Sequence, residues 1–154
     1  MLREAPAPSG RHGDAVLDTP EVATQASIGA SPGEAIYLPY AHTLTKGRPE
    51  IRVAVLDTGV NLSHKELRGK VVQGADFVDL KGLDTTNFIG DIKDYDNVPE
   101  DEVGHGTHVA GIIAAKDNTI GTIGIAPGAT IVGVKVLHNG SGSFGAVVAG
   151  ILYA

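Results

Sequence analysis

The chain has 154 residues, 42% of them hydrophobic, and a formal net charge of −6. This hydrophobic content indicates a globular protein, and the acidic balance without a basic cluster argues against nucleic-acid binding. The absence of cysteine excludes a disulfide framework and a thiolate metal site.

Residues 1–50 are expected to form an N-terminal arm or linker. Residues 1–34 are rich in Ala, Pro, Gly and Ser and show no sustained apolar period, as is typical of linkers. Residues 35–44 predict a short helix that packs on the following domain and is interrupted by Pro39. No apolar segment after Met1 resembles a secretory signal, and no segment is long enough to span a membrane.

An apolar run over residues 51–56 predicts a strand that is buried on both faces. The run is rich in Val and Ile and is interrupted only by Arg52, a composition typical of parallel sheets. Asp57 follows directly, and Gly59 allows the sharp turn that ends the strand. The strand therefore presents a carboxylate at its carboxyl end.

A helix is predicted over residues 104–116, because apolar residues recur at helical spacing while small residues, Gly111 among them, allow close packing on a sheet. His105 lies in its first turn. The carboxyl ends of strands and the N-termini of helices lie at the same edge of an open parallel sheet, so we expect Asp57 and His105 to meet. Asp57 would then fix the tautomer of His105, whose other ring nitrogen could accept a proton from a hydroxyl.

A second buried strand is predicted over residues 130–137, and an amphipathic helix from Ser143 onward. Between them lies Gly140-Ser141-Gly142. Glycines leave backbone N–H and C=O groups unshielded, so an extended peptide can add there as an extra strand. Together these elements predict an α/β fold with a parallel sheet flanked by helices.

The segment between Gly74 and His105 is expected to be a long acidic loop. Calcium prefers several oxygen ligands from carboxylates, amides and backbone carbonyls, so clustered acids on a loop suit it. A solvated acidic surface loop is the alternative, and the sequence favours neither.

The residues around Asp57 and His105 resemble the subtilisin-like serine peptidase family. Asp57-Thr58-Gly59 matches the family's aspartate motif, and residues 105–111, His-Gly-Thr-His-Val-Ala-Gly, match its histidine motif nearly letter for letter. Residues 118–127 resemble the loop and turn after the histidine helix, and residues 135–144 resemble the strand and substrate-binding segment. The resemblance covers about residues 51–154 and implies the three-layer subtilisin-like fold.

This resemblance implies a serine-type endopeptidase that hydrolyses peptide bonds through an Asp-His-Ser triad. Asp57 and His105 match its first two members, whereas the family's Gly-Thr-Ser-Met-Ala type nucleophile segment and its oxyanion asparagine are not in the sequence. We therefore expect residues 51–154 to be the first half of a truncated catalytic domain, inactive alone, and residues 1–50 to include a remnant of a propeptide.

The substrate of such an enzyme is a peptide or protein. By resemblance, Ser141 and Gly142 would line subsites on the acyl side of the cleaved bond, and Phe144 would flank an apolar pocket. An inhibitory propeptide as a second partner and an extracellular location are further expectations from the resemblance.

The resemblance also implies two structural calcium (Ca2+) sites. One matches a loop of thermitase-like members, where the ligands would be Asp76, Asp94, Asp96 and Glu100 with the carbonyl of Val98. The other matches the family's strong site, where the ligands would be Glu66, the side chain of Asn118 and the carbonyls of Lys116, Ile120 and Thr122. The family usually has Asp in place of Glu66, and the alternative is that residues 118–121 simply end the preceding helix.

Three other functions remain open on the sequence. Asp-Thr-Gly after an apolar run also occurs in aspartic peptidases, which would require mostly β structure and a second such motif. A metallohydrolase would use His105, His108 and Asp57 as metal ligands, although His108 is better explained as a packed structural histidine. A noncatalytic peptide-binding protein would keep the subtilisin-like fold and groove without the nucleophile.

Overall fold

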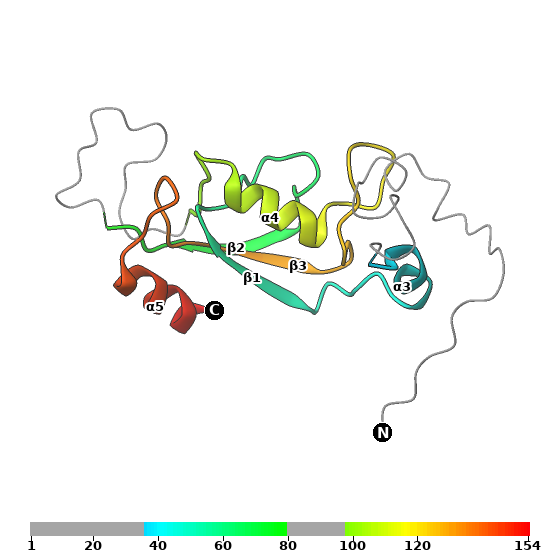
Figure 1. Cartoon of the computed structure of the whole chain (residues 1–154), viewed down its shortest axis with the longest axis horizontal. Helices are drawn as coiled ribbons and strands as arrows, with labels where there is room; N and C mark the ends of the chain where they lie inside the picture. The colour runs from blue at the N-terminus through cyan, green and yellow to red at the C-terminus, as the bar shows by residue number, and fades with distance from the viewer. Residues whose placement is uncertain (1–35, 80–97) are drawn as a thin grey trace, which may run out of the picture.

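The computed structural model of the chain describes residues 36–79 and 98–154, and its centre is a three-stranded parallel sheet (Figure 1). The strands are β1 (Arg52–Asp57), β2 (Val71–Asp76) and β3 (Thr130–Lys135). Their order is β1-β3-β2, so β3 lies between its two neighbours and pairs with both.

The register of the sheet brings one charged residue from each strand to the same edge. Asp57 of β1 and Asp76 of β2 are both paired with Lys135 of β3, and each is the last residue of its strand. Because the strands are parallel, this edge is where all three carboxyl ends meet. Of these three residues, the sequence analysis placed only Asp57 at this edge.

Helix α4 (His105–Ala114) covers one face of the sheet. Its Ala110 and Ala114 are fully buried against Val55 of β1 and Ile131 of β3. Short alanine side chains let the helix axis lie close to the sheet, which fixes the position of the helix N-terminus relative to the end of β1. This helix agrees with the predicted one to within two residues at its end.

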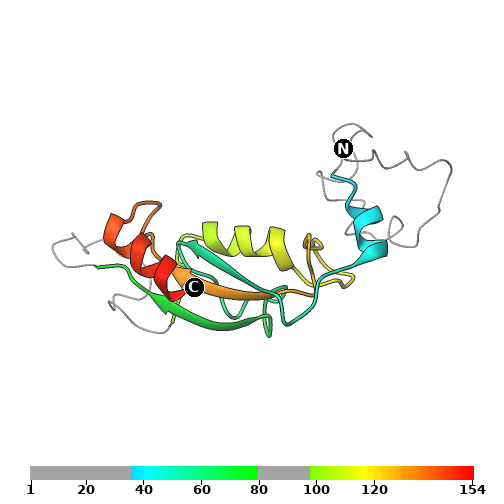
Figure 2. The same cartoon turned by 90° about the horizontal axis from the view of Figure 1, so that it is seen from below.

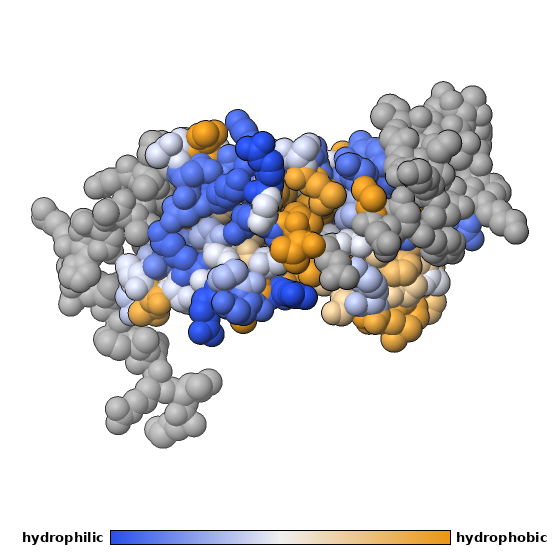
Figure 3. Space-filling view, turned by 180° about the vertical axis from the view of Figure 1, so that it is seen from behind, coloured by the Kyte–Doolittle hydropathy of each residue, from blue (hydrophilic) through white to orange (hydrophobic). Residues whose placement is uncertain are grey.

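Helix α5 (Phe144–Tyr153) lies on the opposite face (Figures 1 and 2). Successive strand residues point to opposite faces, so Val134 and Val136 of the β3 segment pack against Ala146 of α5. The outer side of α5 carries large apolar side chains, of which Phe144 and Leu152 are 86% and 83% exposed. Figure 3 shows this apolar surface over α5 at the right of the view. With α4 on one face and α5 on the other, the molecule has the helix, sheet and helix layers of the predicted α/β subtilisin-like fold.

Two elements differ from the sequence predictions. The acidic loop expected from Gly74 begins only after Asp76, because residues 71–76 form β2. The predicted helix over residues 35–44 is α3 (Leu38–Leu44), and Pro39 lies in its first turn instead of interrupting it. Proline has no N–H, and the first-turn N–H groups have no intrahelical acceptor, so Pro39 is tolerated at the start of α3.

Residues 1–35 of the arm predicted over residues 1–50 lie outside the described residues, as do the acids Asp94 and Asp96. The domain boundary at residue 50 therefore stays a prediction. Among the helices of the described ranges, none has both the length and the hydropathy that crossing a bilayer requires.

Candidate active site

Asp57 and His105, which are 48 positions apart in the sequence, form a hydrogen-bonded pair. His105 Nδ1 lies 2.7 Å from Asp57 Oδ1. The Asp57 side chain is 11% exposed and that of His105 is 64% exposed, so the carboxylate is fixed while the imidazole faces solvent. With Nδ1 engaged, Nε2 is the ring nitrogen that remains for a reacting group.

The backbone at the end of β1 holds the Asp57 carboxylate in place. Thr58 N donates to Asp57 Oδ1 at 2.7 Å, and the Asp57 carbonyl accepts hydrogen bonds from Val136 and Leu137 N–H groups at 2.9 and 3.1 Å. A carboxylate that is buried and hydrogen-bonded in this way keeps one orientation toward its partner.

The pair alters the basicity of the imidazole. The pKa of His105 is raised above its ordinary value, first by the hydrogen bond to Asp57, then by the negative charge of Asp57, with a smaller contribution from Asp101. A carboxylate at this position stabilises the imidazolium that forms when Nε2 takes up a proton. The arrangement can therefore act as a general base whose orienting group is Asp57.

The segment that leads into α4 is anchored by Pro99, which is fully buried. The Pro99 ring lies against Gly74 of β2 and Gly133 of β3, where a Cβ atom at Gly133 would come within 3.0 Å of the ring and one at Gly74 would overlap it. The Pro99 carbonyl accepts a hydrogen bond from Val60 N at 2.7 Å. We call these two glycines and the proline the Pro99 notch; it sets the height above the sheet at which the chain approaches His105.

Lys135 is a buried charged residue at the same edge that the sequence analysis missed. It is 2% exposed, and its Nζ lies 2.7 Å from Glu102 Oε2 and 3.7 Å from Asp76 Oδ2. The ammonium thus joins the ends of β2 and β3 to the segment before α4. A lysine inside a predicted buried strand was the available signal, because a charge there needs a partner.

Asp101 and Thr58 were also missed. Both accept hydrogen bonds from amides of the first turn of α4: Thr58 Oγ1 from Gly106 N at 3.0 Å, and Asp101 Oδ2 from Thr107 N at 2.8 Å. Asp101 was counted among the acids of a loop, and because it lies three residues ahead of the N-cap Gly104, the usual N-cap rule does not identify it.

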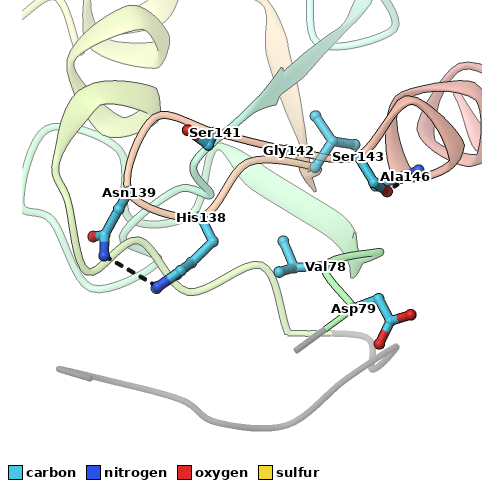
Figure 4. A pocket seen from close by; sticks show the side chains of 9 residues that line it. Val78, Asp79, His138, Asn139, Ser141, Gly142, Ser143 and Ala146 are labelled. Carbon is cyan, nitrogen blue, oxygen red and sulfur yellow. Dashed lines mark hydrogen bonds between the residues drawn. The ribbon is translucent and has the colours of Figure 1, made fainter. Parts of the chain in front are cut away.

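The predicted substrate residues Ser141 and Gly142 line a cavity of about 320 Å³. Figure 4 shows the 138–143 segment on one side of it and Val78 with Asp79 on the other. The backbone of Ser141 is engaged with His138, through N···O distances of 2.6 and 2.9 Å. Phe144 is exposed at the start of α5 and is not part of the cavity lining.

The structure brings some of the predicted calcium ligands together. Asn118 Nδ2 donates to Glu66 Oε2 at 2.9 Å, and Glu66 is 6% exposed. Asp76 is directed to Lys135 and accepts from Val78 N, while Glu100 is exposed. In the ranges 36–79 and 98–154, no group of three or more His, Cys, Asp and Glu side chains is arranged to hold a metal ion.

The alternatives left open by the sequence fare differently. A parallel sheet covered by helices contradicts the mostly β structure that an aspartic peptidase would need. His108 is exposed, so the prediction that it is a packed histidine is wrong. It lies beyond the first turn of α4, on the part of the helix that does not face the sheet.

Comparison with known proteins gives consistent matches. The family model described as "Subtilase family" matches residues 48–154. The chain is 43% identical over 120 residues to the Thermophilic serine proteinase of Bacillus sp. (strain AK1), covering 77% of this chain and 26% of that protein. It is 43% identical over 121 residues to Thermitase of Thermoactinomyces vulgaris, covering 77% and 38% respectively.

Among solved structures, Sphericase superposes with a TM-score of 0.57 at 39% sequence identity, covering 71% of this chain and 33% of that one. The chain therefore spans about a quarter to two fifths of the length of these relatives.

Proposed function

The chain belongs to the subtilase family, and on this premise we propose that Asp57 and His105 are two members of the Asp-His-Ser triad of a subtilisin-like serine endopeptidase. The observation that carries the proposal is the 2.7 Å contact between His105 Nδ1 and the buried Asp57 carboxylate. In the reaction, His105 Nε2 would take the proton of the attacking hydroxyl and return it to the leaving amine. Asp57 would hold the tautomer and stabilise the imidazolium.

The nucleophile is proposed to come from residues outside this sequence. Two serines of the described ranges already have structural hydrogen bonds: Ser63 Oγ donates to Asn61 Oδ1 at 2.8 Å, and Ser143 Oγ accepts from Ala146 N at 3.0 Å as the cap of α5. These contacts support the expectation that neither serine is the nucleophile.

A peptidase assay on the product of the complete reading frame tests the proposal. His105→Ala is expected to lower kcat by on the order of 10⁴-fold or more, and Asp57→Asn by a comparable factor, because each removes one partner of the proton transfer. His64→Ala, which changes an exposed histidine in a surface turn, is the matched control and should keep wild-type activity.

Labelling with a serine-directed phosphonylating reagent reports the nucleophile separately. Labelling that disappears in His105→Ala supports the triad. A protein that binds peptides without labelling or turnover would instead favour the noncatalytic alternative.

The pH dependence of turnover follows from the raised pKa of His105. The imidazole must be neutral to accept a proton, so kcat/KM should rise with pH as His105 loses its proton, and the midpoint should lie above the ordinary value for histidine. Asp57→Asn removes the cause of the shift and should move the midpoint of the residual activity to lower pH. A midpoint that stays in place would contradict the assignment.

For the substrate, we propose that Phe144 and the cavity beside Gly142 contact an extended peptide. Phe144 has no burial that would explain an aromatic residue at the start of α5. Phe144→Ser should raise KM several-fold with little change in kcat, because it removes binding without touching the pair. Leu152→Ser, at the other end of the same helix and similarly exposed, is the control and should leave both constants unchanged.

We also propose a calcium ion at Glu66 and Asn118. A buried carboxylate needs compensating partners, and the loop after α4 folds over this one, with Lys116 N donating to the Glu66 carbonyl at 3.2 Å. The Asn118 side-chain oxygen, which accepts from Ile120 N at 2.7 Å, would become a ligand beside the carboxylate if the amide turned and gave up this hydrogen bond. Added calcium should raise Tm for the wild-type protein and for Glu50→Gln, and should fail to do so for Glu66→Gln.

A further inference from the structure

The start of α4 has no capping side chain of its own. The N-cap residue is Gly104, with φ of 93°, a left-handed conformation that favours glycine. The first amides of a helix have no intrahelical acceptors, so those beside His105 must find acceptors elsewhere. They find them in Thr58, which follows Asp57 in the sequence, and in Asp101.

Asp101 accepts five hydrogen bonds. Its Oδ1 accepts from Thr58 Oγ1 and Gly104 N at 2.8 Å and from Val103 N at 3.2 Å, and its Oδ2 accepts from Thr107 N at 2.8 Å and from Thr107 Oγ1. Both oxygens serve only as acceptors, which an ionised carboxylate alone can do.

Thr58 and Asp101, together with Thr107, form a hydrogen-bonded network beside the Asp57–His105 pair, which we call the bracket. Thr58 Oγ1 donates to Asp101 and accepts from Gly106 N, so one hydroxyl links the residue after Asp57 to the residue after His105. Thr107 Oγ1, which donates to Asp101, also accepts from Asn61 N at 2.9 Å and ties the same turn to the loop after β1. Any displacement of the first turn of α4 from the end of β1 would have to break several of these bonds together.

The negative charge of Asp101 supports the Asp57–His105 pair, as its hydrogen bonds do. Burial disfavours its ionised form, but the hydrogen bonds from Thr107, Gly104 and Thr58 outweigh it and hold the pKa of Asp101 below its ordinary value. The charge of Asp101 in turn helps to raise the pKa of His105. Of the other charged groups at this edge, Asp57 faces His105 directly, and Glu102 is paired with Lys135.

We propose that Asp101 is a positioning residue for the Asp57–His105 pair, acting through Thr58 and the first turn of α4. This inference rests on the proposed function for its catalytic meaning. The bracket is assembled from residues on three segments, so the pair would be prearranged before any substrate arrives.

Asp101→Asn is the first test, carried out on the product of the complete reading frame. The amide places a donor group where one carboxylate oxygen accepts, opposite backbone N–H groups that cannot reverse their role. We expect kcat to fall by on the order of 10²-fold with KM nearly unchanged. Glu50→Gln makes the same chemical change on an exposed carboxylate outside the bracket and should behave as wild type.

Nuclear magnetic resonance of the histidine rings gives a readout that does not depend on turnover. His105→Gln identifies the His105 signals among those of the other histidines. In Asp101→Asn the titration midpoint of His105 should move to lower pH, and the downfield Nδ1 proton of the hydrogen bond to Asp57 should weaken or disappear. A variant that keeps the wild-type midpoint, the downfield proton and kcat would overturn the proposal.

Thr58 provides a second pair of variants if Asp101→Asn fails to fold. Thr58→Ser keeps the hydroxyl and should retain the His105 signals and kcat, whereas Thr58→Val has nearly the same volume without it and should lose both. Identical behaviour of these two variants would refute the bracket. Absence of turnover in the wild-type protein would refute the proposed function only, because the ring signals still report the position of His105.

Discussion

The two faces of the sheet differ in how completely they are covered. On the α4 face, a core that includes Val55, Ala110 and Ile131 is closed, and at the carboxyl edge it gives way to Asp57, Lys135 and their hydrogen-bonded partners. On the α5 face, Val134, Val136 and Ala146 form a smaller apolar core, and the outer side of the helix exposes Phe144 and Leu152.

This difference follows from the alternation of strand residues. In β3, Val134 points to the α5 face and Lys135 to the α4 face, so a single step along the chain separates apolar packing from buried charge. The α4 face holds charged groups that must keep fixed partners, and its helix is accordingly bound at its N-terminus. On the α5 face, the helix is held by apolar packing and by a hydrogen bond from the Tyr153 hydroxyl to the Gly74 carbonyl at 3.2 Å. Four substitutions should break or sharpen this contrast.

The largest loss of stability is expected for Lys135→Met. The change removes the ammonium between Asp76 and Glu102 and leaves two buried carboxylates without it, which typically costs about 3–5 kcal/mol in the free energy of unfolding. Lys46→Met breaks an exposed pair with Asp117 and should cost at most about 1 kcal/mol. Urea denaturation of both variants gives the comparison, and equal costs would contradict the role assigned to burial.

Gly106→Ala should come next and should act on the catalytic pair. A Cβ atom at Gly106 would overlap the carbonyl oxygen of Gly59 and come within 3.0 Å of Asp57 Cβ. We expect a loss of about 1–3 kcal/mol from overpacking together with loss of the downfield His105 proton. Retention of that proton at wild-type stability would show that α4 has freedom to move away from β1.

Gly150→Ala tests the close approach of α5 to its face. Its Cβ would lie 2.6 Å from Val136 Cγ1 and 3.2 Å from Val134 Cγ1, and these are methyl groups that can shift. The overpacking cost exceeds the gain in helix propensity by a small margin, so thermal unfolding should show a net loss of about 1 kcal/mol. The His105 signals should not change, because this face carries none of the charged groups.

Gly111→Ala should produce the smallest effect, and of opposite sign. Nothing lies within 4 Å of a Cβ at this position, so the prediction that Gly111 permits close helix–sheet contact is wrong. Alanine should stabilise α4 by about 0.5–1 kcal/mol through its helix propensity. A destabilised variant would contradict the absence of neighbouring atoms around position 111.

Local signals in the sequence were sufficient for β1, α4 and the contact between Asp57 and His105. One signal is a β-branched run that ends in Asp, and the other is a histidine at the start of a helix that is rich in small residues. Each can be recognised within a short stretch of sequence, and in an open parallel sheet the two are expected at the same edge. The strand β2 was not predicted, and its Gly74 was placed at the start of the acidic loop, whereas a glycine is needed there because the Pro99 ring packs against it.

Contacts between distant segments were not predictable in the same way. The partners of Lys135 come from β2 and from the segment before α4, and the hydroxyl of Thr58 meets Asp101 across 43 positions. Neither pairing is marked by a periodic pattern or a motif in a short stretch of the sequence. The calcium and substrate assignments came from family resemblance and stay predictions, since no ligand or turnover has tested them.

The Pro99 notch has a consequence for how this fold can vary. Because the proline ring is seated on Gly74 and Gly133, the chain downstream of it starts from a fixed point. Insertions or deletions upstream of that point need not be transmitted to the imidazole. Evolution can therefore lengthen or shorten the acidic segment ahead of residue 98 as an independent module, while the reacting geometry is inherited unchanged.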